Sequence, residues 1–127
     1  MPDTGYGYIR AGEKQAGSEE VLRVQHFHEK PEAERARTYI EDGCYWNTGL
    51  LLVRADSLAA AFAAYMPEFW ECVQTLDLPN PDLESFTHLP DISLDYALLE
   101  KIQTCALCPV DMGWSDIGTL DRLRASA

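Results

Sequence analysis

Two stretches near the start of the chain alternate between apolar and polar residues. In residues 4–10 tyrosine and isoleucine stand between glycines, and in residues 21–29 valine and phenylalanine stand among arginine, glutamine and histidine. A period near two is typical of half-buried strands, although the second stretch keeps that period imperfectly. We therefore predict two strands, joined by a hairpin loop over the polar, glycine-containing residues 11–20.

A polar stretch after Pro31 has the features of a helix. Proline suits the first helical position, because its missing N–H would have no partner there. We expect the helix to run to Glu41 or Asp42. Gly43 can then end it in a left-handed conformation, which glycine adopts without steric cost.

A second helical pattern is more apolar. Asp56 or Ser57 can cap its start, and Leu58, Phe62 and Tyr65 would share one face.

Later helices are marked by single residues. Pro67 interrupts the second helix and can start another over residues 68–76. Ser93 can cap a further helix that ends near Gln103.

Leucine and valine form a continuous apolar run over residues 50–53, flanked by polar residues. Such a run predicts a strand that is covered on both faces. We expect a last strand at residues 105–110, a turn at residues 114–118 and a short closing helix at residues 119–125. The proline-containing residues 78–91 are predicted to form a loop.

Strands that alternate with helices indicate an α/β fold. We predict one domain over residues 1–127, with a mixed, partly parallel sheet and flanking helices. Ligands of such sheets bind beyond the carboxyl ends of strands, where most polar groups of interest fall in this sequence.

The net charge excludes two classes of partner. Twenty-one acidic residues against 10 basic ones give a formal charge of -11, which repels nucleic acid and anionic lipid. We therefore expect no nucleic-acid or membrane partner, and any bound phosphate needs a local lysine, backbone amides or a divalent cation. No apolar run reaches the ~18 residues of a membrane span, and no signal pattern is present. The prediction is a cytoplasmic protein with reduced cysteines.

Two groups of polar residues are candidates for binding. The first follows the second predicted strand, and the other precedes the apolar run at residues 50–53. Glu29 can accept hydrogen bonds from sugar hydroxyls and Lys30 can pair with a phosphate, but the two residues can equally form a surface ion pair before a helix. Asn47 offers a donor and an acceptor to vicinal hydroxyls beside Trp46. The alternative is an asparagine turn with Trp46 in the core.

Three further candidates also have structural alternatives. Asp116 can bind Mg²⁺ with a second ligand from elsewhere, or can form a turn or helix cap. Gly7 lets a backbone approach a ligand, or simply belongs to a glycine-rich turn. Asp95 can complement a helix dipole. A zinc site formed by Cys105, Cys108, His26 and His28 is disfavoured. Two cysteines three residues apart on a strand would point to opposite faces.

The order of these groups is more specific than any one of them. It resembles the mannose-1-phosphate guanylyltransferases of the sugar nucleotidyltransferase family, over essentially the whole chain. The resemblance is carried by TGYGYI at residues 4–9, FHEKP at 27–31, YWNTG at 45–49, SLDYA at 93–97 and GWSDIG at 113–118.

The resemblance implies part of a Rossmann-like nucleotidyltransferase fold and a reaction. Such enzymes join mannose 1-phosphate to GTP, giving GDP-mannose and pyrophosphate, with Mg²⁺ as cofactor. In this resemblance Gly7 and Glu29 would hold sugar hydroxyls and Lys30 the 1-phosphate. Asn47 would contact the sugar ring, and Asp95 would be a further substrate-binding residue.

The resemblance also implies that Asp116 is one of two metal-binding aspartates, so Lys30 and Asp116 are the catalytic candidates. One departure matters: the family's glycine-rich, arginine-containing phosphate loop does not occur in these 127 residues. The chain would then be a piece of a longer or split enzyme, inactive alone. It would act with a nucleotide-binding N-terminal segment or self-associate. The alternative is a noncatalytic sugar-phosphate-binding or assembly module.

Overall fold

The computed structural model describes residues 2–76 and 83–117. Their contacts divide the chain into two compact units, Met1–Leu50 with Ala106–Ala127, and Leu51–Cys105. The first unit contains the strands and one helix, and the second contains the remaining helices. The interpretation of residues 1–127 as a single partial domain stays a prediction.

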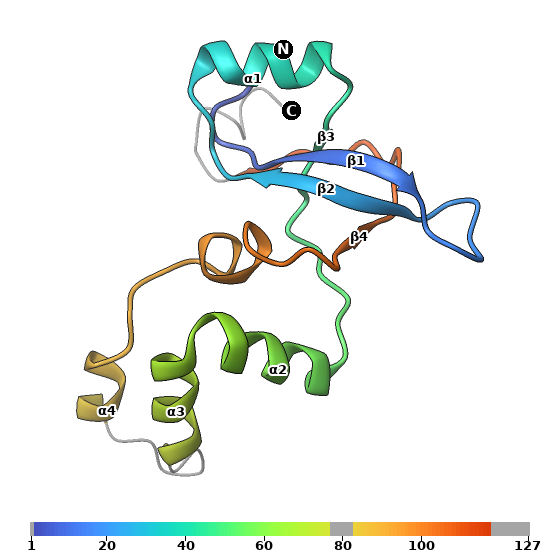
Figure 1. The fold of residues 1–127 in the computed structure, drawn as a ribbon. Helices are drawn as coiled ribbons and strands as arrows, with labels where there is room; N and C mark the ends of the chain where they lie inside the picture. The colour runs from blue at the N-terminus through green and yellow to red at the C-terminus, as the bar shows by residue number, and fades with distance from the viewer. Residues whose placement is uncertain (1, 77–82, 118–127) are drawn as a thin grey trace. The chain divides into compact units, whose positions relative to one another are not determined.

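The first unit is built on a four-stranded sheet with the order β3-β1-β2-β4 (Figure 1). All three pairings between these strands are antiparallel. The strands are β1 Tyr8–Lys14, β2 Leu22–His28, β3 Tyr45–Trp46 and β4 Ala106–Leu107.

The predicted hairpin is confirmed, with a shift in its first strand. β1 starts later than expected and extends to Lys14, so the loop is shorter than residues 11–20. The loop is closed by the Gln15 N–H, which donates to the Val21 carbonyl at 2.7 Å. Gly17 supplies the positive φ of 83° that the reversal needs.

The expectation of a partly parallel, mixed sheet is wrong for the strands that the structure describes. β1 and β2 are joined by a tight hairpin, which allows only antiparallel pairing. The apolar run at residues 50–53, which was predicted to be a strand covered on both faces, forms no strand. The α/β class, with a sheet and flanking helices, is confirmed.

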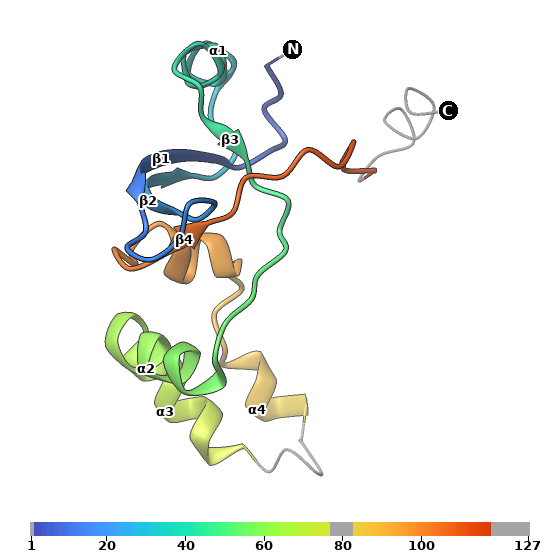
Figure 2. The same ribbon diagram turned by 90° about the vertical axis from the view of Figure 1, so that its right-hand side faces the viewer.

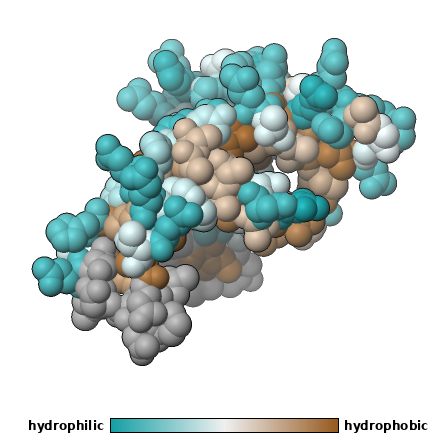
Figure 3. Space-filling model, turned by 60° about the horizontal axis from the view of Figure 1, so that its bottom comes forward, coloured by the Kyte–Doolittle hydropathy of each residue, from teal (hydrophilic) through white to brown (hydrophobic). Residues whose placement is uncertain are grey.

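The apolar run is exposed rather than covered on both faces. Leu50 is 77% exposed and Leu52 is 101% exposed. Apolar side chains reach the surface elsewhere too, as brown patches among the hydrophilic residues show (Figure 3). The prediction failed because a strand needs a backbone partner as well as apolar side chains. Within residues 2–76 and 83–117, no strand pairs with this run.

One helix covers a face of the sheet (Figures 1 and 2). This helix, α1 Ala33–Glu41, buries Ala36 completely against the core residues Tyr6 and Tyr8. Its predicted end is confirmed, because Gly43 has a φ of 72°. The N–H groups of Gly43 and Cys44 donate to carbonyls of the last helical turn at 3.0 and 2.8 Å. This is the bonding of a Schellman cap.

The second unit begins with two consecutive helices, α2 Ala55–Tyr65 and α3 Pro67–Thr75. Pro67 occupies the first turn of α3, as predicted. The ring of Phe62 packs 5.0 Å from that of Phe69 and lies parallel to that of Trp70 at 6.4 Å. These contacts join residues close in sequence.

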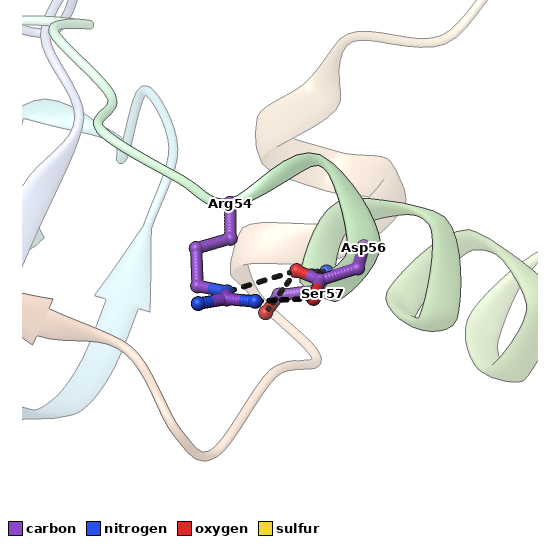
Figure 4. Close-up of polar contacts among 3 residues, drawn as sticks. All are labelled: Arg54, Asp56 and Ser57. Carbon is purple, nitrogen blue, oxygen red and sulfur yellow. Dashed lines mark hydrogen bonds and ion pairs between the residues drawn. The ribbon is translucent and has the colours of Figure 1, made fainter.

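The start of α2 differs from the expected cap. The helix begins at Ala55, so Asp56 lies inside its first turn. The Asp56 carboxylate accepts hydrogen bonds from the Arg54 guanidinium at 2.6 and 3.0 Å and from the Ser57 N–H at 2.7 Å (Figure 4). The bond from Arg54 lowers the pKa of Asp56.

The rest of the second unit departs from prediction mainly in length. A short helix, α4 Leu83–Thr87, lies in the stretch predicted as loop. The π-helix η1 Asp95–Leu99 ends before Gln103 and packs beside α2. Its cap is confirmed, because the Ser93 hydroxyl accepts the Tyr96 N–H at 3.4 Å.

The C-terminal predictions are only partly covered by the structure. The last strand is restricted to β4, shorter than residues 105–110. The closing helix at residues 119–125 and the end of the predicted turn, Gly118, lie outside the described residues. None of the helices in residues 2–76 and 83–117 has the length and apolar character needed to cross a bilayer.

Candidate functional site

The backbone just before β1 is held by hydrogen bonds to the side chains of Asp3 and Tyr8. The Tyr8 hydroxyl donates to the Asp3 carbonyl at 2.9 Å and accepts the Asp3 N–H at 3.0 Å. The Asp3 carboxylate accepts the Gly5 N–H at 2.7 Å. Tyr8 is completely buried, and these part-buried bonds hold the backbone at Asp3 and Gly5.

Gly7, Glu29 and Asn47 meet at one end of the sheet. Antiparallel pairing places the start of β1 beside the ends of β2 and β3. The Asn47 N–H donates to the Gly7 carbonyl at 2.8 Å. A Cβ added to Gly7 would lie 2.6 Å from Glu29 Oε2 and 3.2 Å from the Asn47 Cβ. Only glycine therefore allows this close approach.

Glu29 and Lys30 form the charged part of this cluster. Lys30 Nζ lies 2.8 Å from Glu29 Oε1. The Glu29 side chain is only 8% exposed, whereas that of Lys30 is 57% exposed. The carboxylate is thus sheltered while the ammonium faces solvent. The predicted ion pair exists, but its acidic partner is too buried for an ordinary surface pair.

The backbone at Lys30 is unusual. Its φ is 43°, the only positive φ of a non-glycine residue in the described part of the chain. A non-glycine residue in this region costs of order 1–3 kcal/mol. Pro31 follows, and proline restricts the preceding residue to extended conformations in most chains. Such strain is found most often at active sites and ligand-binding segments.

Asn47 forms the turn of the structural alternative, although Trp46 is 40% exposed rather than in the core, and the contact of Asn47 with a sugar stays a prediction. Its side-chain oxygen accepts the Gly49 N–H at 3.0 Å, which is the asparagine turn of the structural alternative. Its backbone nevertheless bonds Gly7, and its Cβ lies next to Glu29 and Gly7 in the cluster. The turn therefore positions Asn47 in the cluster.

Asp116 belongs to the same compact unit as Gly7, Glu29 and Asn47. It is half-buried, and Trp114, two residues earlier, packs against the core with its ring 5.1 Å from that of Tyr6. Across residues 2–76 and 83–117, no three His, Cys, Asp or Glu side chains gather as a metal site would require. A single carboxylate here fits only an ion completed by phosphate, water or further ligands, as Mg²⁺ often is.

Asp95 belongs to the other compact unit. It is the first residue of η1, where a carboxylate complements the helix dipole. Its contact with a sugar ring remains a prediction.

The contacts of the cysteines and of His28 are those of structural residues. All four cysteines are free thiols. Burial raises the pKa of the Cys44 and Cys105 thiols, which favours the protonated, unreactive form. The His28 ring stacks on Tyr39 with centroids 4.7 Å apart.

Sequence reasoning named Trp46 beside Asn47 but missed the contacts of Tyr6 with Trp46 and Trp114. Tyr6 is 8% exposed, and its ring contacts both Trp46 and Trp114. The signal in the sequence was their position. Tyr6 and Trp46 directly precede Gly7 and Asn47, and Trp114 stands two residues before Asp116.

The chain is similar in sequence to several longer proteins. The mannose-1-phosphate guanylyltransferase of Escherichia coli is 37% identical over 134 residues, which cover 97% of this chain and 28% of that protein. The alginate biosynthesis protein AlgA of Pseudomonas aeruginosa is 39% identical over 127 residues, covering 93% of this chain and 26% of that protein. The chain thus spans less than a third of the length of these relatives.

Solved structures give the same picture. A Thermus thermophilus protein described as a mannose-1-phosphate geranyltransferase matches with a TM-score of 0.74 and 32% identity, over 84% of this chain and 31% of that one. A Helicobacter pylori mannose-6-phosphate isomerase matches in fold, with a TM-score of 0.75 and 21% identity over 91% of this chain and 48% of that one. The profile of the nucleotidyl transferase family matches residues 1–127, and the chain therefore belongs to that family.

Proposed function

We propose that this chain provides the mannose 1-phosphate and metal-binding part of a mannose-1-phosphate guanylyltransferase. The whole enzyme would transfer GMP from GTP to mannose 1-phosphate, giving GDP-mannose and pyrophosphate. The observation that carries the proposal is the meeting of Gly7, Glu29, Lys30 and Asn47 at one end of the sheet. These residues come from three separate motifs of the chain.

The sheltered carboxylate suits a sugar. An ionised carboxylate accepts hydrogen bonds only, so Glu29 can take two sugar hydroxyls at once. Its low exposure reduces competition from water, which makes each bond more selective. The absence of a side chain at Gly7 lets the Glu29 carboxylate and the Asn47 side chain pack close to its backbone, which brings the two candidate sugar-binding residues together.

Lys30 suits the phosphate. The chain carries a net charge of -11, so a phosphate needs a local cation to be held. The Lys30 ammonium is exposed and stands beside Glu29, so one ligand could reach both with its phosphate and its hydroxyls. The strained backbone at Lys30 supports a role in which its direction matters.

Asp116 is proposed as a ligand of Mg²⁺, which would neutralise charge that develops on the phosphates during transfer. With one carboxylate from the described residues, the remaining ligands would be substrate oxygens, water or an aspartate outside this sequence. The part of this chain would then be to hold the sugar phosphate in line for attack and to exclude water from its hydroxyls.

The proposal includes a requirement for a further segment. No glycine-rich phosphate loop occurs in these residues, so we expect no transfer activity from the chain alone. Mixing it with the N-terminal segment of a relative, and assaying release of pyrophosphate, should restore activity. Binding of mannose 1-phosphate without any restored transfer would instead support the noncatalytic binding module.

Titration calorimetry with mannose 1-phosphate tests the site itself. Lys30→Ala should weaken binding at least tenfold, because charged hydrogen bonds are worth about 1.5–3 kcal/mol. Glu29→Gln should weaken it too, since the amide accepts fewer hydroxyls. The matched control is Lys14→Ala, which breaks the exposed ion pair of Lys14 with Glu19 on the hairpin and should leave binding unchanged. Equal affinity for the parent and the Lys30 variant would refute the proposal.

We also propose that the isolated chain self-associates, because Leu50 and Leu52 are exposed apolar residues without strand partners in the described structure. Light scattering should give a mass above that of one chain at micromolar concentration. Leu52→Ser should lower this mass without changing the far-ultraviolet circular dichroism. A monomeric parent would contradict the proposal.

A further inference from the structure

Three aromatic rings meet behind the proposed site. The ring of Tyr6 lies 5.1 Å from that of Trp46 at an interplanar angle of 71°, and 5.1 Å from that of Trp114 at 56°. Edge-to-face and tilted pairs at this separation are attractive by about 0.5–1.5 kcal/mol beyond their burial. Tyr6 therefore stands at the centre of an aromatic cluster of Tyr6, Trp46 and Trp114.

Each member of the aromatic cluster is next to a proposed ligand-binding residue. Tyr6 directly precedes Gly7, Trp46 directly precedes Asn47, and Trp114 stands two residues before Asp116. The cluster thus joins three motifs that are distant along the chain. It is the point at which the positions of their polar residues are coupled.

The contact with Tyr6 matters most for the C-terminal motif at residues 113–118. Residues 111–117 form neither helix nor strand, so no regular backbone ladder positions them. Trp114 is nevertheless packed against the buried core beside Tyr6. Because Asp116 is so close to Trp114 in sequence, this packing restricts where the Asp116 carboxylate can be.

We propose that Tyr6 is a positioning residue, whose ring holds the Asn47 and Asp116 segments in register with Gly7 and Glu29. The inference rests on the proposed function, because the ligand it serves is mannose 1-phosphate. Tyr6 acts through its tryptophan neighbours and need not touch the ligand. Supporting residues of this kind typically change affinity or activity by 10–100-fold when they are mutated.

Tyr8 provides a matched control, because it differs from Tyr6 in its neighbours rather than in its type or burial. Both tyrosines belong to the same buried core with Ala36. The Tyr8 ring, however, packs 5.6 Å from Tyr39 of α1 and does not join the aromatic cluster. A role limited to folding predicts that Tyr8→Leu affects ligand binding at least as much as Tyr6→Leu.

The first experiment measures the tryptophans without ligand. In a Trp70→Phe background the remaining tryptophans are Trp46 and Trp114, whose fluorescence can be followed with acrylamide quenching. Tyr6→Leu should raise the quenching constant of both, and Tyr6→Phe should restore the parent value. Unchanged quenching in Tyr6→Leu would overturn the inference.

The second experiment measures mannose 1-phosphate binding by calorimetry on the 127-residue chain with Mg²⁺ present. Tyr6→Leu should weaken binding about tenfold, and Tyr6→Phe should bind like the parent. Trp114→Leu, whose segment has no regular secondary structure to lose, should weaken binding similarly. The double variant should be no weaker than either single one, because both changes break the same coupling.

The outcomes separate the two claims. If the parent does not bind mannose 1-phosphate, the proposed function fails, and the role of Tyr6 in binding fails with it. If the parent binds and Tyr8→Leu weakens binding as much as Tyr6→Leu, only the positioning role is overturned. Additive losses in Tyr6→Leu and Trp114→Leu would overturn it as well.

Discussion

Each of the two compact units is stabilised internally by a different kind of contact. In the unit with the sheet, Tyr6, Trp46 and Trp114 touch although they are far apart in sequence. In the helical unit, Phe62 contacts Phe69 and Trp70 a few residues away. Tyr8 is completely buried in the sheet unit. In the helical unit the buried residues Ala97 and Leu98 lie in η1, whereas neither α2 nor α3 buries any residue.

This difference explains where the candidate chemistry lies. A rigid site needs side chains that are held from several directions, and long-range contacts provide this. Gly7, Glu29 and Asn47 are held by three strand ends in the sheet unit. The helical unit contributes only Asp95 to the predicted site residues. We expect changes in the sheet unit to affect ligand binding, and changes in the helical unit at residues other than Asp95 to affect stability alone.

The largest effect is expected from the aromatic contacts of the helical unit. Phe62→Ala removes both ring contacts between α2 and α3 and should destabilise the unit by about 2 kcal/mol, less than a fully buried phenylalanine. Urea unfolding followed at 222 nm measures the change. Leu52→Ala, a truncation at a fully exposed residue, should stay within about 0.5 kcal/mol of the parent. Loss of mannose 1-phosphate affinity in Phe62→Ala would break the division between the units.

A substitution in the sheet unit should act on binding instead. In Gly7→Ala the new Cβ would collide with Glu29 Oε2, and because this oxygen ends a flexible side chain, it can move away. Stability should fall by only about 1 kcal/mol, while affinity for mannose 1-phosphate falls about tenfold. Calorimetry and urea unfolding measure the two.

The control for this prediction is another glycine of the same strand region. At Gly12 an added Cβ would meet its nearest atom at 3.5 Å, an ordinary contact. Gly12→Ala should therefore bind the ligand like the parent and be slightly more stable. Equal affinities of the two alanine variants would show that the close approach at Gly7 has no role in binding.

An effect confined to stability, and so smaller than the combined losses of Gly7→Ala, is expected from the hydroxyl of Tyr8. Tyr8→Phe removes two hydrogen bonds to the Asp3 backbone and leaves these polar groups without their partner. Stability should fall by about 1–1.5 kcal/mol, measured by urea unfolding. Tyr65→Phe, at an exposed tyrosine of α2, is the control and should be neutral. Equal stability of Tyr8→Phe and the parent would mean that water replaces the hydroxyl fully.

The smallest effect concerns the exposed pair at the start of α2. The pKa of Asp56 is lowered from 3.8, chiefly by Arg54, so its contribution to stability is present above the unfolded pKa and is lost as pH falls through the folded pKa. Asp56→Asn should lower the urea midpoint slightly near pH 7, and less in about 0.5 M salt. The difference from the parent should shrink below pH 3.8.

A double variant tests whether Arg54 is the cause. If the pair carries the effect, Arg54→Gln added to Asp56→Asn should produce no further loss. A difference from the parent that grows as pH falls would contradict the assigned sign.

Several local features were predictable from sequence because their causes are local. Alternation located the hairpin strands, and Pro67 located the start of α3. Gly43 ended α1 as expected, because few other residues adopt its left-handed backbone without cost. The ordered motifs also pointed to Glu29 and Asn47 before their contact was known, since residue type limits which chemistry a side chain can perform.

The amino-acid sequence by itself determined the family, the local ends of helices and the types of side chain available for binding. Only the tertiary structure decided that residues 50–53 stay exposed, that the Glu29 side chain is sheltered beside Gly7, and that the ring of Tyr6 contacts two tryptophans. The physical reason is that strand pairing and burial depend on partners far along the chain. The identity of such partners is not encoded in the periodicity of the segment itself.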